Sequence, residues 1–144
     1  MFLVGRRGML PTRRAYITIA ELLDLPLILP SRSHASRRIL EERAFAINST
    51  VNAIVEVDDT SLVRTLLRQG LGFSVLSQGA FENAIDRKEL EARPIRPRMS
   101  WPLAMMTASG RPRSEPLDAL MVTIRTTVRD LIAAGHWPAK HLDK

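Results

Sequence analysis

The sequence predicts an α/β fold, because strand-like and helical segments alternate and a strand–helix–strand unit stands at its centre. This unit spans residues 51–77, VNAIVEVDDTSLVRTLLRQGLGFSVLS. A β-branched run over 51–57 is typical of a strand, and apolar residues at helical spacing follow over 62–67. A second apolar run, 73–76, closes the unit. A crossover of this length joins parallel strands, so we expect a mostly parallel sheet covered by helices.

The elements before this unit follow from turn residues and apolar runs. Phe2–Val4 has the character of the end of a buried strand, and a polar, arginine-rich connection follows it. Thr18 is placed to cap a short helix over 19–23, because its hydroxyl can accept an amide of the first turn. The run from Pro26 to Pro30 is strand-like and bounded by prolines, and a helix is predicted from about 36 to 47.

Inside the central unit, short polar residues and glycines mark the ends of the helix. Asp58, Asp59 and Thr60 supply side chains that cap its start. Gly70 stands where a helix end favours a left-handed residue, and Gly72 indicates close packing. A phosphate-binding loop is disfavoured, because such loops run strand, glycines, helix, whereas the order here is helix, glycines, strand.

The C-terminal third contains the longest predicted helix. It begins after Ser114, runs to Ile132 and carries a continuous apolar stripe. The other predictions are a helix over 78–85, a polar link over 86–89, a strand ending at Ile95, a strand over 103–107 and a turn over 109–114.

Composition excludes several classes of protein. The 144 residues suit one globular domain, and the absence of cysteine excludes disulfides and thiolate metal sites. Of the 21 basic side chains all but three are arginines, and they are scattered along the chain, so the net charge of +6 does not indicate a nucleic-acid footprint. The N-terminal MFLVGRR is no secretory signal, and no apolar run has the length of a membrane span. We expect a cytoplasmic protein without membrane contact.

Polar residues follow two of the predicted strands and form the candidate site. The strand 26–29 leads into Ser31, Arg32, Ser33 and His34, and the segment from Phe73 leads into Ser77 and Gln78. Ligands of α/β proteins gather outside the carboxyl ends of parallel strands. If these strands are neighbours, the hydroxyls, helix amides and the Arg32 guanidinium favour a small anionic ligand such as a carboxylate. The alternative is two ordinary helix caps and a surface arginine.

Other constellations do not indicate chemistry. His34, His136 and His141 lack metal-ligand spacing with acidic residues, so we expect neither a metal nor a cofactor. The pair Glu41–Glu42 alternates with arginine on a solvated helix face, and Asp58–Asp59 is placed to cap a helix.

Four segments together resemble one known family. They are LLDLPLILPSRSHASRRILEERA, VEVDDTSLVRTLLRQGLGFSVLS, ELEARPI and LMVTIRTTVRDLIAAGHW. Their order and spacing resemble the C-terminal part of the effector-binding domain of LysR-type transcriptional regulators, over roughly residues 2–137.

The resemblance implies a fold similar to a type 2 periplasmic binding protein, with two α/β lobes and an inducer in the cleft between them. Residues 1–144 would be a partial effector-binding domain. About 17–96 would form a nearly complete second lobe, 1–16 and 97–137 the crossing strands and part of the first lobe, and 138–144 a tail. The loop from Ser31 to His34 and the turn from Phe73 to Gln78 would face the inducer.

The function implied is sensing of a small, anionic effector and self-association as a dimer or tetramer, without catalysis. DNA would be bound only through a winged helix-turn-helix that this sequence lacks, so we expect a portion of a longer regulator. Two alternatives are a small α/β enzyme that positions an anionic substrate with Arg32 and uses His34 as acid or base, and a solute receptor of the same fold.

Overall fold

The structure, a computed structural model, describes residues 1–81, 85, 88–100, 102–108, 110, 114–137 and 139–140. It divides into two compact units, residues 1–102 and 103–144. The strands are β1 (Phe2–Arg6), β2 (Ile17–Thr18), β3 (Leu27–Leu29), β4 (Ala53–Glu56), β5 (Ser74–Leu76) and β6 (Leu90–Arg96). The helices are α1 (Ile19–Leu23), α2 (Ala35–Phe45), α3 (Thr60–Arg68), the 3-10 turn η1 (Gln78–Ala80) and α5 (Glu115–Ala133).

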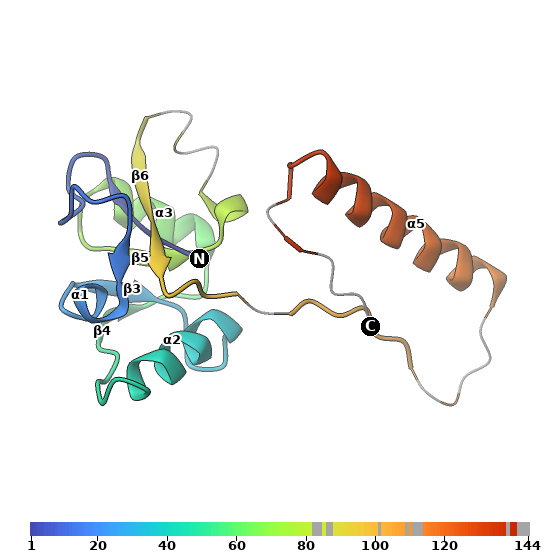
Figure 1. The fold of residues 1–144 in the computed structure, drawn as a ribbon, viewed down its shortest axis with the longest axis horizontal. Helices are drawn as coiled ribbons and strands as arrows, with labels where there is room; N and C mark the ends of the chain where they lie inside the picture. The colour runs from blue at the N-terminus through green and yellow to red at the C-terminus, as the bar shows by residue number, and fades with distance from the viewer. Residues whose placement is uncertain are drawn as a thin grey trace. The chain divides into compact units, whose positions relative to one another are not determined.

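The first unit is built on a mostly parallel sheet, as the sequence predicts. Four strands lie in the order β2-β6-β1-β5, and β3 and β4 form a parallel pair (Figure 1). A parallel bridge between Leu27 and Phe73 connects β3 to β5 and so joins the two groups. Among the strands in the described ranges only β1 runs against its neighbours, since it pairs antiparallel with both β5 and β6.

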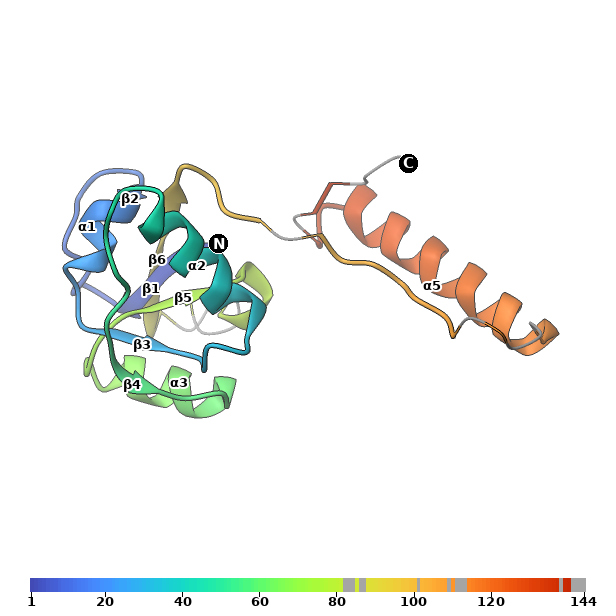
Figure 2. The same ribbon diagram turned by 90° about the horizontal axis from the view of Figure 1, so that it is seen from below.

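Helices cover both faces of this sheet, which explains why its strands are apolar on both sides. One core cluster contains Leu3, Leu27 and Val75 with residues of α1 and α2. The other contains Val4 and Ile28 with residues of α3. Figure 2 shows α1 and α2 on one side of the strands and α3 on the other. Successive strand residues therefore enter opposite cores, as the alternation of side chains along a strand requires.

The helix ends predicted at Thr18, Asp59 and Gly70 are confirmed, whereas the helix predicted over about 36–47 spans Ala35–Phe45. Thr18 and Glu21 form a reciprocal capping box at α1, because the Glu21 N–H donates to Thr18 Oγ1 (3.3 Å) and the Thr18 N–H donates to Glu21 Oε2 (2.9 Å). The Leu62 N–H donates to Asp59 Oδ1 (2.6 Å) at the start of α3. Gly70, with φ +77°, ends that helix in the left-handed conformation.

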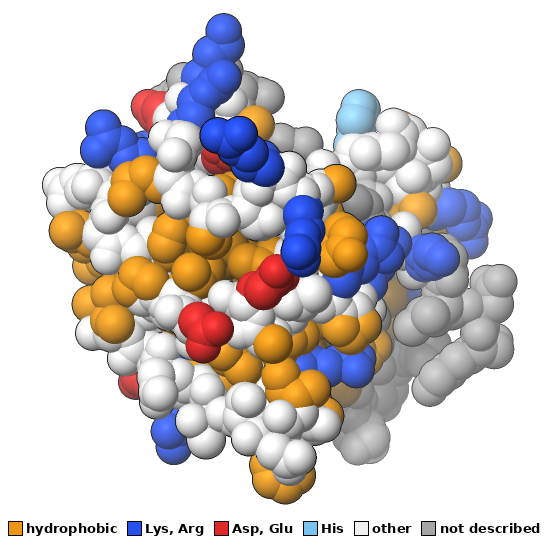
Figure 3. All heavy atoms as spheres, turned by 60° about the vertical axis from the view of Figure 1, so that its left-hand side comes forward, with side chains coloured by type: hydrophobic (Ala, Val, Ile, Leu, Met, Phe, Trp, Pro, Cys, Tyr) orange, Lys and Arg blue, Asp and Glu red, His pale blue; other side chains and the backbone are white. Residues whose placement is uncertain are grey.

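The face of the first unit shown in Figure 3 carries basic and acidic side chains interspersed with apolar ones. No helix among the described residues has both the length and the hydrophobicity needed to cross a membrane.

The second unit consists of an extended segment and α5. The predicted long helix is confirmed, although Ser114 at its N-cap makes no side-chain capping hydrogen bond. The predicted strand over 103–107 is wrong, since residues 102–108 adopt no secondary structure. A strand needs a neighbouring strand for its backbone groups, and none of the described strands pairs with this segment.

Some predictions fall partly on positions that the structure does not describe. The predicted helix over 78–85 begins with the 3-10 turn η1, but residues 82–84 lie outside the described ranges. Parts of the predicted link over 86–89, the turn over 109–114 and the tail over 138–144 also lie outside them.

Candidate functional site

The two strands that lead into the predicted site residues are parallel neighbours. The Ile28 N–H donates to the Phe73 carbonyl oxygen (2.7 Å), and the Phe73 N–H donates to the Pro26 carbonyl oxygen (2.9 Å). Parallel strands end at the same edge of a sheet. Residues 31–34 after β3, here called the first corner, and residues 77–78 after β5, the second corner, therefore leave the sheet at the same edge.

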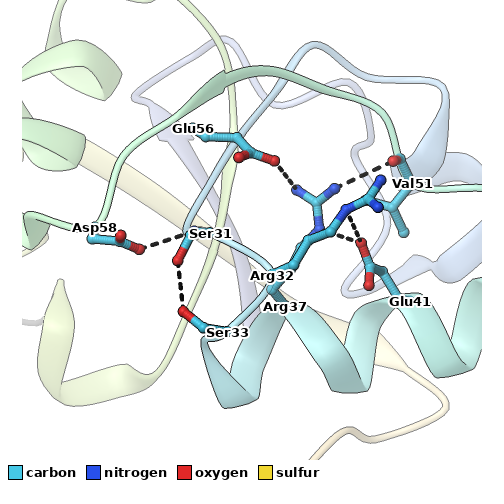
Figure 4. A network of polar contacts seen from close by, with 8 residues as sticks. All are labelled: Ser31, Arg32, Ser33, Arg37, Glu41, Val51, Glu56 and Asp58. Carbon is cyan, nitrogen blue, oxygen red and sulfur yellow. Dashed lines mark hydrogen bonds and ion pairs between the residues drawn. The ribbon is translucent and has the colours of Figure 1, made fainter.

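The first corner is held by polar contacts that Figure 4 shows from close by. The Ser31 N–H donates to Oδ1 of Asp58 (2.9 Å), which links this corner to the segment between β4 and α3. The hydroxyls of Ser31 and Ser33 are 2.9 Å apart and share a hydrogen bond. A backbone amide and two hydroxyls thus gather in one place, with hydrogen-bonding groups suited to an anion.

Arg32 adds a positive charge to the first corner. Its side chain is 77% exposed, and Nε lies 3.5 Å from Oε1 of Glu41 on α2. An exposed ion pair of this length contributes little to stability, so the guanidinium can exchange Glu41 for another anion at small cost.

Arg37 on α2 stands behind this corner and was not among the predicted site residues. Only 2% of its side chain is exposed, and Nε donates to Oε1 of Glu41 (2.9 Å). Nη2 donates to the Val51 carbonyl oxygen (3.4 Å), while Nη1 lies 3.9 Å from Oε1 of Glu56 (Figure 4). Arg37 therefore ties α2 to the chain around β4, and its spacing of four residues from Glu41 was the only signal in the sequence.

His34 is the N-cap of α2. Its Nδ1 accepts from the Ser36 N–H (3.3 Å) and lies 2.7 Å from the Ser36 hydroxyl. The helix-cap alternative accounts for this nitrogen, which leaves the rest of the exposed ring to face solvent.

The second corner consists of Ser77 and Gln78 at the start of η1. Ser77 is exposed and precedes η1 without a side-chain capping bond, and Gln78 is half-buried within η1. Phe73 lies at the opposite, amino end of β5. Its side chain is 8% exposed and belongs to the core that α1 and α2 cover, with its ring against Gly5. Phe73 therefore stands away from the corners, and we leave it out of the proposed site.

Asp58 contacts the first corner, although the sequence predicted that it would cap α3. Only Asp59 caps α3, whereas Asp58 binds across to Ser31. The hydrogen bonds from Ser31, first from its backbone, lower the pKa of Asp58, and the nearby His34 adds to this effect. Asp58 is thus a carboxylate held in its charged form at the corner. Among the described residues no three His, Cys, Asp or Glu side chains are grouped as metal ligands.

A model of the family described as "LysR substrate binding domain" matches residues 1–129. The chain belongs to this family. The prediction made from the four sequence segments is therefore confirmed.

A curated relative supports the assignment. The HTH-type transcriptional regulator BbuR of Bordetella bronchiseptica is 27% identical to this LysR substrate-binding domain over 122 residues. The match covers 84% of this chain and 38% of BbuR, so the chain spans well under half the length of that relative.

Solved structures show the same fold. The Synechocystis CcmR regulatory domain in complex with 2-PG matches with a TM-score of 0.71 at 17% identity, over 87% of this chain and 61% of that chain. HinK, a LysR family transcriptional regulator from Pseudomonas aeruginosa, matches with a TM-score of 0.67 at 17% identity, over 88% of this chain and 43% of the HinK chain. The predicted type 2 periplasmic-binding-protein fold is confirmed by these similarities.

Proposed function

We propose that this LysR substrate-binding domain is the effector-sensing part of a bacterial transcriptional regulator, and that the two corners bind a small anionic effector. The observation that carries the proposal is the parallel bridge between Leu27 and Phe73, which brings both corners to one edge of the sheet. Ser31, Arg32, Ser33, Ser77 and Gln78 are the proposed contacts. The 2-PG in the CcmR complex is consistent with an anionic ligand.

In this proposal residues 97–137 supply a crossing strand and part of the first lobe, and residues 138–144 are a tail. Effector binding then favours a closed arrangement of the lobes and shifts the population towards it. DNA is contacted by a separate domain of the regulator, in the cytoplasm, and the effector is not transformed. The enzyme alternative is disfavoured because His34 Nδ1 is engaged in capping α2.

Self-association has a candidate surface at the open edge of the sheet. β4 is the outermost strand beyond β3, and it exposes Ile54 and Val55. Phe45 and Ile47, at the end of α2, are also exposed. An apolar edge strand with unpaired backbone groups favours contact with another chain. Ile54→Lys should reduce the mass measured by light scattering at a fixed protein concentration, and an unchanged mass would contradict a role of this surface in self-association.

Thermal unfolding in the presence of small carboxylates tests the sensor proposal. A panel of aromatic and aliphatic carboxylates should contain at least one that raises the Tm, since a ligand bound only to the folded state stabilises it by mass action. Arg32→Ala should abolish the rise. Arg38→Ala should retain it, because Arg38 is an exposed arginine of α2 outside the corner.

Two outcomes would contradict the proposal. One is a panel without any stabilising compound. The other is chemical conversion of a stabilising compound, followed by NMR of the incubated mixture, which would favour the enzyme alternative.

A further inference from the structure

The Asp58 carboxylate already accepts the hydrogen bond of a backbone N–H that an anionic ligand at the first corner would use. Its Oδ1 accepts the Ser31 N–H at 2.9 Å. The two serine hydroxyls of the corner are bonded to each other. The corner is therefore satisfied by an internal carboxylate in this structure, and Figure 4 shows Asp58 pointing at Ser31 from the far side of the corner.

Asp58 can leave this position without loss of other structure. The side chain of Asp58 is exposed, so its carboxylate becomes hydrated on release. The neighbouring Asp59 supplies the hydrogen bond that caps α3, which therefore does not depend on Asp58. The contact joins two loops, after β3 and after β4, and so can open while both strands stay paired.

We propose that Asp58 is an intramolecular competitor of the effector's anionic group. An incoming carboxylate accepts the hydrogen bond from the Ser31 N–H in place of Asp58, and the Asp58 side chain rotates into solvent. One hydrogen bond is exchanged for another, and no covalent bond changes. This inference deepens the proposed function and rests on it, in that the first corner is taken as the effector site.

The competition with Asp58 sets the affinity of the first corner for the effector, and it couples effector binding to a change in loop contacts. A site that is closed for part of the time binds its ligand more weakly in proportion to the open fraction. For an exposed, charge-assisted contact, removal of the competitor should tighten binding by about two- to five-fold. Each binding event also releases the β4–α3 segment from the β3–α2 segment, so that occupancy changes the contacts of two loops.

Acetate is a suitable probe, because it carries the same group as the Asp58 side chain. The amide resonance of Ser31 in a ¹⁵N-labelled full chain reports on the acceptor of its N–H. Sodium acetate is titrated against sodium chloride at constant ionic strength, and the half-saturation concentration is read at Ser31. The variants are Asp58→Ala, which frees the donor, and Asp58→Asn, which keeps an oxygen acceptor but removes the charge.

Asp59→Asn is the matched control, since it removes the same charge one residue away without touching Ser31. We expect the tightest acetate binding in Asp58→Ala, intermediate binding in Asp58→Asn, and binding close to that of the unmodified chain in Asp59→Asn. The spectrum of each variant also shows that it is folded.

Equal or weaker acetate binding in Asp58→Ala than in the unmodified chain would overturn the inference. So would the absence of any acetate-dependent shift at Ser31 in that variant. An equal gain in Asp59→Asn would assign the effect to net charge and overturn it as well. Failure of the sensor proposal is distinguishable: acetate at high concentration would then replace Asp58 as expected, while no compound of the carboxylate panel raised the Tm at concentrations far below the half-saturation concentration of acetate.

Discussion

Gly72 lies so close to Pro26 that a Cβ on Gly72 would come within 2.6 Å of the Pro26 carbonyl oxygen. That oxygen also accepts the Phe73 N–H and so helps to join β5 to β3. The glycine therefore permits the strand contact that brings the two corners to one edge.

Gly72→Ala should destabilise the protein by about 1–3 kcal/mol, the usual range for a clash within a packed core. The measurement is urea unfolding followed by circular dichroism. Gly79→Ala is the control, because nothing lies within 4 Å of the added Cβ. Equal midpoints for the two variants would show that β3 and β5 can separate freely at this point.

Arg37→Ala should lower the free energy of unfolding by about 2–4 kcal/mol, since it removes a buried side chain together with its hydrogen bonds to Glu41 and to the Val51 carbonyl oxygen. Arg37→Met, which keeps much of the side-chain volume, should lower the free energy of unfolding by a smaller amount. Arg38→Ala, an exposed change on the same helix, should stay within about 0.5 kcal/mol of the unmodified chain. Similar losses of unfolding free energy for Arg37→Ala and Arg38→Ala in urea titrations would contradict a stabilising role of the buried Arg37 side chain.

Ser74→Ala should leave stability unchanged or raise it by up to about 1 kcal/mol, because the buried hydroxyl of Ser74 has no hydrogen-bond partner among the described residues. Ser36→Ala is the matched comparison, since its hydroxyl contacts His34 Nδ1 at 2.7 Å. This variant should lose about 1 kcal/mol. A larger loss in Ser74→Ala than in Ser36→Ala would reveal a bound water or another partner at Ser74.

Acid should remove the contribution of the α1 capping box. The backbone and side-chain hydrogen bonds from Thr18 lower the pKa of Glu21. A carboxylate with a lowered pKa in the folded state stabilises the protein above its unfolded pKa, about 4.3 for glutamate, and loses this contribution as the pH falls through the folded value. The difference in Tm between the unmodified chain and Glu21→Gln should therefore be constant from pH 7 to 5 and shrink below that. A constant difference down to pH 3 would contradict the assignment.

Local signals predicted most of the elements of the first unit. Thr18, Asp59 and Gly70 mark helix ends through interactions with backbone groups a few residues away, and such interactions are legible in sequence. The prediction of a strand over 103–107 was wrong because strand formation depends on distant parts of the chain. Its apolar residues fit a strand, but a strand exists only where another strand meets it.

In the candidate site, too, contacts between sequence neighbours were predictable and contacts between distant residues were not. Ser31, Arg32 and Ser33 were predicted from their place after a strand, and the structure brings them together. Asp58 was assigned to a cap because it neighbours Asp59, whereas its partner Ser31 lies 27 positions earlier. The sequence by itself therefore determined the family, the α/β class and the helix caps, which depend on neighbours along the chain. The pairing of Leu27 with Phe73, the bond from Ser31 to Asp58 and the burial of Arg37 join residues that are distant along the chain, so only tertiary packing could decide them.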